Sequence, residues 1–418
     1  MQIEEKPQPN PQQPVWTTFT AAPHRMMFFG GAIQLLLPMF FWSLELIGRY
    51  TQLWTPLDMT MPSTWAHGFI MLYGVFIFFI FGFLFTVYPR WMNGPLVPRD
   101  SYISTFVWLS SGMLLFQIGL FFNSLLSTIG LSIFLFGWAF GQYALFKVYR
   151  TAPAQNKVYE TVLNFALTGG WLSALSFLAW MLTDDWFFQF FSLKAGIWLF
   201  MLPVLFTVSH RMLPFFSSSI IKDYIVVQPR WSLLALVFAG IAHLLLELAQ
   251  LPQWLFLVDI PMAMIALFHT VKWRFISSFA DRLLAVLHMA FLWLGIAMSL
   301  YSIQSLYLLL SDELILARAP LHALTIGYFS SLLIAMASRV SYGHSGRMLI
   351  LDNIIWAVFL GIQLTAILRI LSDTNSFNQL FGLNLNIIAV LLWILCMASW
   401  VIRFGPIYLS QRIDNKPG

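Results

Sequence analysis

Imidazole side chains are the main groups in this sequence that could hold a metal ion or a haem. There are eight histidines and a single cysteine, Cys396, which lies inside an apolar run. One thiol excludes a disulfide within the chain, Cys-ligated iron–sulfur clusters, thiolate zinc sites and the C-x-x-C-H attachment of a c-type haem. Any metal or haem must therefore be held by His, Met, Tyr or carboxylate groups, and imidazole is the natural ligand for haem iron and copper.

Two of the histidines begin apolar stretches of membrane-spanning length. His67 stands near the start of the stretch 65–88, and His322 near the start of 319–338. A haem with two axial histidines needs them on facing helices at equal depth, and this pair meets the depth condition. An ionisable side chain inside a membrane span costs free energy, so we treat each of these two histidines as a candidate functional residue. Whether the two helices touch is left open, and an interfacial or capping role is the alternative.

A third histidine, His243, has a carboxylate on the same helix face. Glu247 follows it by four residues, the spacing at which side chains of one helix meet. The two form a candidate metal pair, because imidazole and carboxylate are both common ligands. A hydrogen bond between the two side chains, without any metal, is the alternative.

A further group of basic side chains gathers around the ends of two other apolar stretches. It comprises His210, Arg211, Arg339, His344 and Arg347. Guanidinium beside imidazole suits anionic groups such as haem propionates or phosphate. Anchoring to anionic lipid is the alternative. We predict that His344 lies in a link after the tenth stretch and that His288 lies about 9 Å inside a helix end, at 1.5 Å per residue. His24 and His269 are interpreted as interfacial or capping residues.

These side chains must be positioned by membrane-spanning helices. The chain is 59% hydrophobic and only 9% charged, with a mean hydropathy of +0.78, too little charge for a soluble surface. Twelve continuously apolar stretches, each of about 17 to 25 residues, are long enough for a hydrocarbon core of roughly 30 Å. We predict an all-α polytopic membrane bundle of about twelve transmembrane helices, at 27–47, 65–88, 103–122, 125–149, 161–182, 190–210, 231–250, 253–270, 283–307, 319–338, 351–371 and 380–402.

The basic residues orient this bundle. The two tails and the even-numbered links carry 18 of the 22 Lys and Arg residues, and the other side carries only Arg49, Lys194, Arg318 and Arg369. The positive-inside rule therefore places both termini in the cytoplasm. His67, His243 and His322 then form an outer layer. A cytoplasmic layer holds His210, His288 and His344.

The same count bounds the domains and the partners. We predict a disordered cytoplasmic tail over 1–24, a transmembrane domain over 25–404 and a cytoplasmic tail over 405–418. The basic residues are spread over many short links and form no patch, so a nucleic acid is not an expected partner, whereas the lipid bilayer is. No link is long enough to form a separate domain, so the function must lie within the bilayer or at its two faces.

Several segments resemble the NnrS family of membrane proteins. The most specific are HALTIG at 322–327 and SRVSYGHSGR at 338–347, supported by GFLFTVYPRW at 82–91, RMLPFF at 211–216 and LHMAFLWL at 287–294. Members of that family often have His-x-His-Glu where this chain has Trp65-Ala66-His67-Gly68, which leaves His67 as a single ligand here. The resemblance implies that His67, His288, His322 and His344 are candidate cofactor-binding residues.

The resemblance implies a bacterial inner-membrane protein that contains haem b, with copper as a second candidate cofactor. It further implies nitric oxide or a related small molecule as a partner, in nitric-oxide metabolism or resistance to nitrosative stress, and leaves open a membrane electron donor. It brings no established catalytic mechanism, so no catalytic residue is assigned. A twelve-helix transporter of a small solute, haem or metal ion is the alternative. A haem–copper oxidase-type reductase ranks last, because its high-spin site needs adjacent histidines and none occur.

Overall fold

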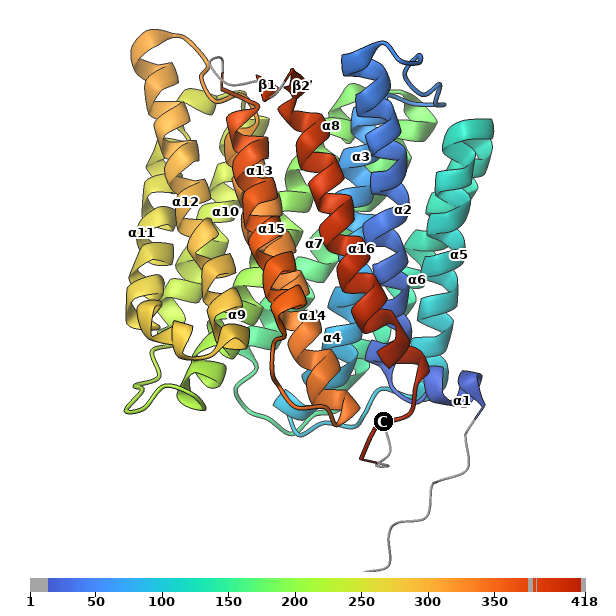
Figure 1. Cartoon of the computed structure of the whole chain (residues 1–418), viewed down its shortest axis with the longest axis vertical. Coiled ribbons are helices and arrows are strands. Elements are labelled where there is room, and N and C mark those ends of the chain that lie inside the picture. The colour runs from blue at the N-terminus through green and yellow to red at the C-terminus, as the bar shows by residue number, and fades with distance from the viewer. Residues whose placement is uncertain (1–13, 375–378, 381, 415–418) are drawn as a thin grey trace, which may run out of the picture.

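Twelve helical passes run between two ends of a bundle and follow the order of the twelve predicted stretches (Figure 1). The computed structural model describes residues 14–374, 379–380 and 382–414. The passes are α2 (Pro23–Thr51), α3–η1–α4 (Ser63–Phe69, Ile70–Val75, Phe76–Trp91), α5 (Arg99–Phe122), α6 (Ser124–Thr151), α7 (Val158–Thr183), α8–η2–α9 (Trp186–Ala195, Gly196–Met201, Leu202–Ser218), α10 (Arg230–Leu248), α11 (Phe256–Lys272), α12 (Arg282–Ser311), α13–η5–α14 (Ala319–His322, Ala323–Ser330, Ser331–Ser345), α15 (Asn353–Leu371) and α16 (Leu385–Leu409).

Five short elements lie outside these passes. They are the helix α1 (Val15–Phe19), the 3₁₀ turns η3 (Pro252–Trp254) and η4 (Ile276–Ala280), and the antiparallel strands β1 (Gln379–Leu380) and β2 (Leu383–Asn384). With helices this dominant in the described residues, the predicted all-α polytopic class is confirmed.

Eleven helices in the described ranges are long and apolar enough to cross a membrane. The remaining pass, α11, has 17 residues and lies beside α12 in Figure 1. The two chain ends lie at the same end of the bundle, because Arg25 at the start of α2 donates to the carbonyl oxygens of Tyr408 and Ser410 at the end of α16. An even number of passes follows from that contact.

We call the end where α2 begins and α16 ends the basic end. Within the described residues, the order of the elements brings every Lys and Arg to this end except Arg49, Lys194, Arg318 and Arg369. That asymmetry agrees with the positive-inside rule and makes the basic end the expected cytoplasmic end.

Polar residues mark where many of the helices begin. Asparagine or aspartate stands just before a helix and its side chain accepts a hydrogen bond from a backbone N–H of the first turn, which otherwise has no partner. This arrangement occurs at Asn123, Asp185, Asp281, Asp352 and Asn384. The caps explain why apolar stretches separated by so few residues still form separate helices.

Three passes occupy the interior of the bundle. The second, sixth and tenth passes are buried over 89%, 78% and 78% of their most apolar stretch, against 33–67% for the other candidate spans. The same three contain π-helical segments, namely η1, η2 and η5. Such segments are rare and often occur at functional sites. The interior therefore consists of passes spaced four apart along the chain, which does not match a six-plus-six repeat.

Several predicted boundaries differ from the structure. His344 does not lie in a link, because α14 continues to Ser345 and ends at Gly346, whose φ of +74° favours glycine. The last turns stay helical because their buried face packs on α16, where Ser341 Oγ lies 2.8 Å from Tyr408 Oη. His210 likewise lies within α9, not at its end.

The helices at the two chain ends also extend into the predicted tails. Residues 1–13 of the predicted tail lie outside the described residues, as do residues 415–418 of the other. From Pro14 onward the N-terminal segment is ordered, with α1 followed by α2. Pro23 takes the first position of α2, where its missing N–H costs nothing, and His24 follows inside the helix. At the other end, α16 extends beyond residue 404 to Leu409.

Candidate functional site

His67 and His322 lie at the end of the bundle opposite the basic end. His67 belongs to α3 and His322 is the last residue of α13, and each is followed at once or within one turn by a π-helical segment. The two imidazoles are near enough for charge on one to be felt by the other. The second and tenth passes thus place both imidazoles at the same end of the bundle, within electrostatic range of each other.

The imidazole of His322 is oriented by its own helix. Its Nδ1 lies 2.9 Å from the carbonyl oxygen of Arg318, one turn earlier, and only an N–H can donate to that oxygen. The proton therefore sits on Nδ1 and Nε2 carries the lone pair. This is the tautomer in which a metal-ligating histidine is usually held by a backbone carbonyl.

His67 is held by packing rather than by a hydrogen bond. Its ring stacks on Trp42 of α2, with centroids 4.1 Å apart and planes 10° apart. No hydrogen bond to its imidazole is formed by any residue that the structure describes. Both ring nitrogens are therefore available to a ligand, while the ring plane is fixed by the indole.

Charged groups surround this outer pair. Arg318 and Arg369 are near enough to act electrostatically on both imidazoles. Arg369 forms an ion pair of 2.9 Å with Asp373, and Asp373 Oδ2 lies 3.9 Å from His322 Nδ1. Two guanidinium groups beside two imidazoles suit a ligand that carries carboxylates as well as a metal.

His243 is committed to a buried ionic network. Its Nδ1 lies 2.6 Å from Asp259 Oδ1, and both side chains are fully buried. Glu247 is bound instead by Lys194, at 2.5 Å, and by the indole N–H of Trp198, at 3.0 Å. His243 Nε2 lies 3.8 Å from Glu247 Oε1. Lys194, Glu247, His243 and Asp259 thus form a chain of alternating basic and acidic side chains, in which His243 Nε2 has no hydrogen-bond partner.

No group of three or more His, Cys, Asp or Glu side chains suited to a metal ion occurs in the described part of the chain. Sequence analysis missed Asp259, although a carboxylate inside the stretch 253–270 is itself a signal of an intramembrane partner. It missed Lys194 because lysine at a span end normally reaches solvent.

A second pair of imidazoles lies at the basic end. His24 of α2 and His344 of α14 have ring centroids 4.7 Å apart. Arg25, Arg90 and Arg412 act electrostatically on both rings. The interpretation of His24 as an interfacial or capping residue is wrong, since the side chain is buried at 3% exposure and does not cap α2. Proline at position 23 was the sequence signal for a helix start that would have placed it.

The predicted basic group at this end is divided by the fold. Arg211 pairs with Glu160 at 3.1 Å and lies 4.3 Å above the ring of Trp91. Arg339 lies 3.9 Å above the ring of Phe216. Both guanidinium groups thus have partners of their own. Of the predicted group, only Arg347 has a buried guanidinium nitrogen without a hydrogen-bond partner. Arg347 lies close enough to Arg25 to act on it electrostatically.

His210 joins a separate cluster. Its Nε2 lies 3.2 Å from Ser232 Oγ, and Nε2 of His269 lies 2.8 Å from the same oxygen. Tyr159 Oη lies 3.0 Å from His210 Nδ1. Because Ser232 donates to a backbone carbonyl, both imidazoles donate to it through Nε2. His210 is therefore a structural hydrogen-bonding residue here.

His288 is also bonded within the core. Its Nε2 lies 2.9 Å from Ser217 Oγ of α9. The histidines thus fall into two facing pairs, two hydrogen-bonded clusters and this single bond.

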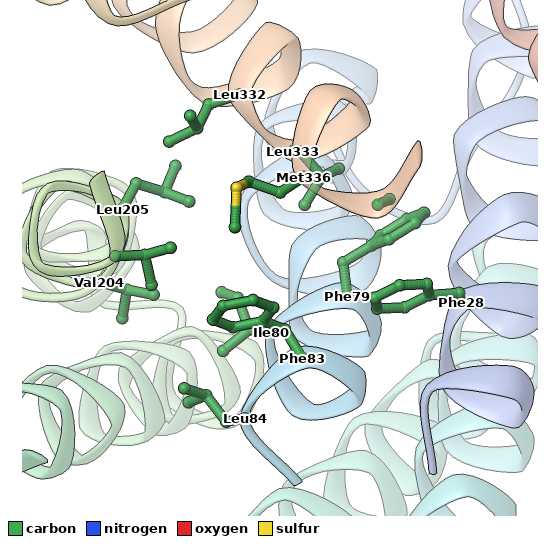
Figure 2. A pocket seen from close by; sticks show the side chains of 12 residues that line it. Phe28, Phe79, Ile80, Phe83, Leu84, Val204, Leu205, Leu332, Leu333 and Met336 are labelled. Atoms are coloured by element: carbon green, nitrogen blue, oxygen red, sulfur yellow. The ribbon is translucent and has the colours of Figure 1, made fainter. Parts of the chain in front are cut away.

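An apolar cavity of about 30 Å³ lies between α2, α4, α9 and α14. Figure 2 shows aliphatic and aromatic side chains converging on it from the interior passes. Phe28 and Phe79 close one side, and Phe28 also contacts the ring of His24 at 6.1 Å. A dry apolar space of this size suits a small apolar molecule better than a polar solute.

The family model described as NnrS protein matches residues 18–412. The chain belongs to the NnrS family. No curated protein matches it. Membership in the NnrS family supports a membrane protein linked to nitric oxide, and the long apolar helices support a multi-pass protein in contact with lipid. The match spans both histidine pairs, so both are parts of the NnrS domain of this chain.

Proposed function

We propose that this NnrS-family chain binds haem b between its second and tenth passes, where His67 and His322 would hold it. The single observation that carries the proposal is the hydrogen bond from His322 Nδ1 to the Arg318 carbonyl, which leaves Nε2 as a ligand. His67, free of hydrogen bonds to the described residues, stands within electrostatic reach. A bound haem would supply an iron centre that can change oxidation state, and nitric oxide would bind that iron only where one of the two imidazoles gives up its place.

The residues of this chain fit such a group in three ways. The Arg318 carbonyl holds the His322 tautomer, and the Trp42 indole holds the plane of His67. Arg318 and Arg369 offer guanidinium groups to the propionates, with Asp373 already paired to Arg369. These residues bind and orient. None of them is assigned a catalytic step.

Copper does not find an equivalent site. Glu247 is engaged by Lys194 and Trp198, which leaves His243 Nε2 as a single unpaired nitrogen beside it, and no cluster of three metal-ligating side chains exists in the described residues. We therefore derive no function through copper bound there.

Nitric oxide is the proposed small-molecule partner. It is a small, nearly apolar molecule, and the interior cavity of about 30 Å³ is lined by aliphatic and aromatic side chains and the thioether of Met336. The alternative function, a twelve-helix transporter of a small solute, haem or metal ion, finds no polar binding group in the lining of this cavity. We further propose the bacterial inner membrane as the location, with the basic end in the cytoplasm, and a membrane electron donor where turnover occurs.

A visible spectrum tests the haem proposal. Purified protein in detergent is expected to show a Soret band and a pyridine hemochrome of haem b. His67→Ala and His322→Ala are each expected to abolish the low-spin spectrum, whereas the matched control His269→Ala, from a different cluster, retains it. Absence of haem in the wild type would refute the proposal. An unchanged spectrum in both variants would reject this ligand pair and move the search to His288 and His344.

A further inference from the structure

Four helix ends converge around His24 and His344 at the basic end. The start of α2 supplies His24 and Arg25, and the end of α4 supplies Arg90. The end of α14 supplies His344, with Arg347 just beyond it, and Arg412 follows α16. Figure 1 shows the ends of α4, α14 and α16 at this side of the bundle.

The cluster is strongly cationic and partly unsatisfied. His24 and Arg25 are each only 3% exposed, yet His24 Nδ1 and Arg25 Nε have no hydrogen-bond partner. A buried guanidinium nitrogen of Arg347 is likewise without one. Buried polar atoms in native proteins are nearly always paired, so three orphans near one another indicate a missing partner.

The charge of the cluster indicates the sign of that partner. Arg25, Arg90 and Arg412 act on both imidazoles, and Arg347 acts on Arg25. The carboxylate of Asp414 is held by Arg412, at 2.6 and 2.8 Å. Among the described residues named here, one carboxylate beside four guanidinium groups leaves a net positive charge, which a cation would increase and an anion would reduce.

The backbone favours an anion as well. Ala22 precedes α2 and offers no side-chain cap, Pro23 has no N–H, and the N–H of Arg25 donates to the Ala22 carbonyl at 3.1 Å. The partial positive charge of a helix N-terminus adds to that of the side chains. Imidazole N–H and guanidinium N–H groups both donate, and together they match a tetrahedral oxyanion with several acceptor oxygens.

We propose that His24, His344, Arg25, Arg90 and Arg347 form a binding site for a phosphate-class oxyanion at the basic end of the bundle. The site is separate from the proposed haem site and does not depend on it. The same chemistry fits two sources, namely free inorganic phosphate and the headgroup of an anionic phospholipid. The central position of the cluster among four helix ends, with His24 buried, favours the free anion over a lipid at the bundle's rim.

The experiment uses the full-length protein and inorganic phosphate as the probe. Binding of radiolabelled phosphate is measured in nanodiscs of phosphatidylcholine for the wild type, Arg347→Gln, His344→Gln and Arg90→Gln. Arg230→Gln is the matched control, because it removes an exposed arginine from the same end outside the cluster. A second arm uses native mass spectrometry after reconstitution with phosphatidylglycerol. Gel filtration and thermal unfolding verify folding, and Arg90→Gln keeps the test valid if buried variants misfold, because Arg90 is exposed.

The expected result is saturable phosphate binding that weakens roughly tenfold or more in Arg347→Gln and His344→Gln, less in Arg90→Gln, and not in Arg230→Gln. Retention of phosphatidylglycerol by the wild type and its loss from the cluster variants, without phosphate binding, would support the same site with a lipid source. The proposal is overturned if neither anion binds, if Arg230→Gln has the same effect, or if only copper or zinc binds through the two histidines. Haem content is recorded in parallel, so failure of the haem proposal is seen independently.

Discussion

The two histidine pairs differ in what surrounds them, although both join the first or second pass to the tenth. At the outer end, His322 has its Nδ1 proton held by a carbonyl, and the nearby Arg369 is balanced by Asp373. At the basic end, Arg25, Arg90 and Arg412 act on His24 and His344, and Arg347 acts on Arg25, while Asp414 is the carboxylate that pairs with Arg412. We therefore propose that two imidazoles serve as metal ligands at the outer end and that two others serve as hydrogen-bond donors to an anion at the basic end. The surroundings, rather than the residue type, separate the two functions.

The largest expected effect is that a substitution in one histidine pair removes the ligand of that pair and leaves the ligand of the other pair bound. His322→Ala should abolish the haem spectrum and leave phosphate binding intact, because the ligand is lost only at the outer end. His344→Ala should weaken phosphate binding roughly tenfold and leave the Soret band unchanged. Both quantities are measured on the same preparations. Loss of haem in His344→Ala would break the comparison, since it would make the basic end a haem site.

The next effect concerns the third outer histidine, His243, which we interpret as structural. Asp259→Asn removes the charge paired with it at 2.6 Å in a fully buried position. Breaking one partner of a buried pair costs on the order of 3 kcal/mol, so the thermal unfolding midpoint in detergent should fall clearly. Haem per folded molecule should not change. Asp312→Asn, an exposed aspartate at the same end, is the control, and an equal shift in both variants would contradict a special role for the network.

A smaller effect sharpens the outer site. Trp42→Leu removes the indole that stacks on His67 at 4.1 Å. Such ring contacts are worth about 0.5–1.5 kcal/mol, so haem affinity should fall roughly two- to tenfold while the low-spin spectrum persists. Competition with apomyoglobin measures the affinity. Trp186→Leu, an exposed tryptophan at the same end, should behave as the wild type. Unaltered affinity in Trp42→Leu would show that packing does not hold the ring.

The smallest effect uses salt to compare the two ends. Raising sodium chloride from about 0.05 M to about 0.5 M shortens the screening length, so phosphate binding at the basic end should weaken several-fold. Haem content at the outer end should stay constant, because coordination by imidazole is not screened. Titrations of phosphate and spectra of haem at each salt concentration test this. Haem loss that parallels phosphate loss would indicate one coupled site instead of two.

Much of the architecture could be predicted from sequence, because membrane-spanning helices are local features. Each pass corresponds to a continuous apolar stretch in the sequence, and the twelve predicted stretches match the twelve passes of the described residues. Polar caps such as Asn123 and Asp281 mark helix starts within the same few residues. Boundaries were less certain where buried polar residues extend a helix, as at the end of α14 beyond residue 338.

The candidate sites could be predicted only in part. Counting passes was enough to assign His67 and His322 to the same end, and an apolar context marked them as unusual. The partners of His24 could not be found this way, because Arg90, His344 and Arg412 are far from it in sequence. Likewise, Asp259 meets His243 only because α10 and α11 pack side by side.

The sequence by itself determined the class of protein, the order of the passes, the basic end and the end of the bundle at which His67 and His322 lie. These properties depend on hydropathy and charge, which are sums over neighbouring residues. Only the tertiary structure decided which histidine faces which, and which arginine is already neutralised by a carboxylate or an aromatic ring. Those choices depend on how helices far apart along the chain pack, and it is this packing that makes His67 with His322 the proposed haem ligands and His24 with His344 the proposed anion site.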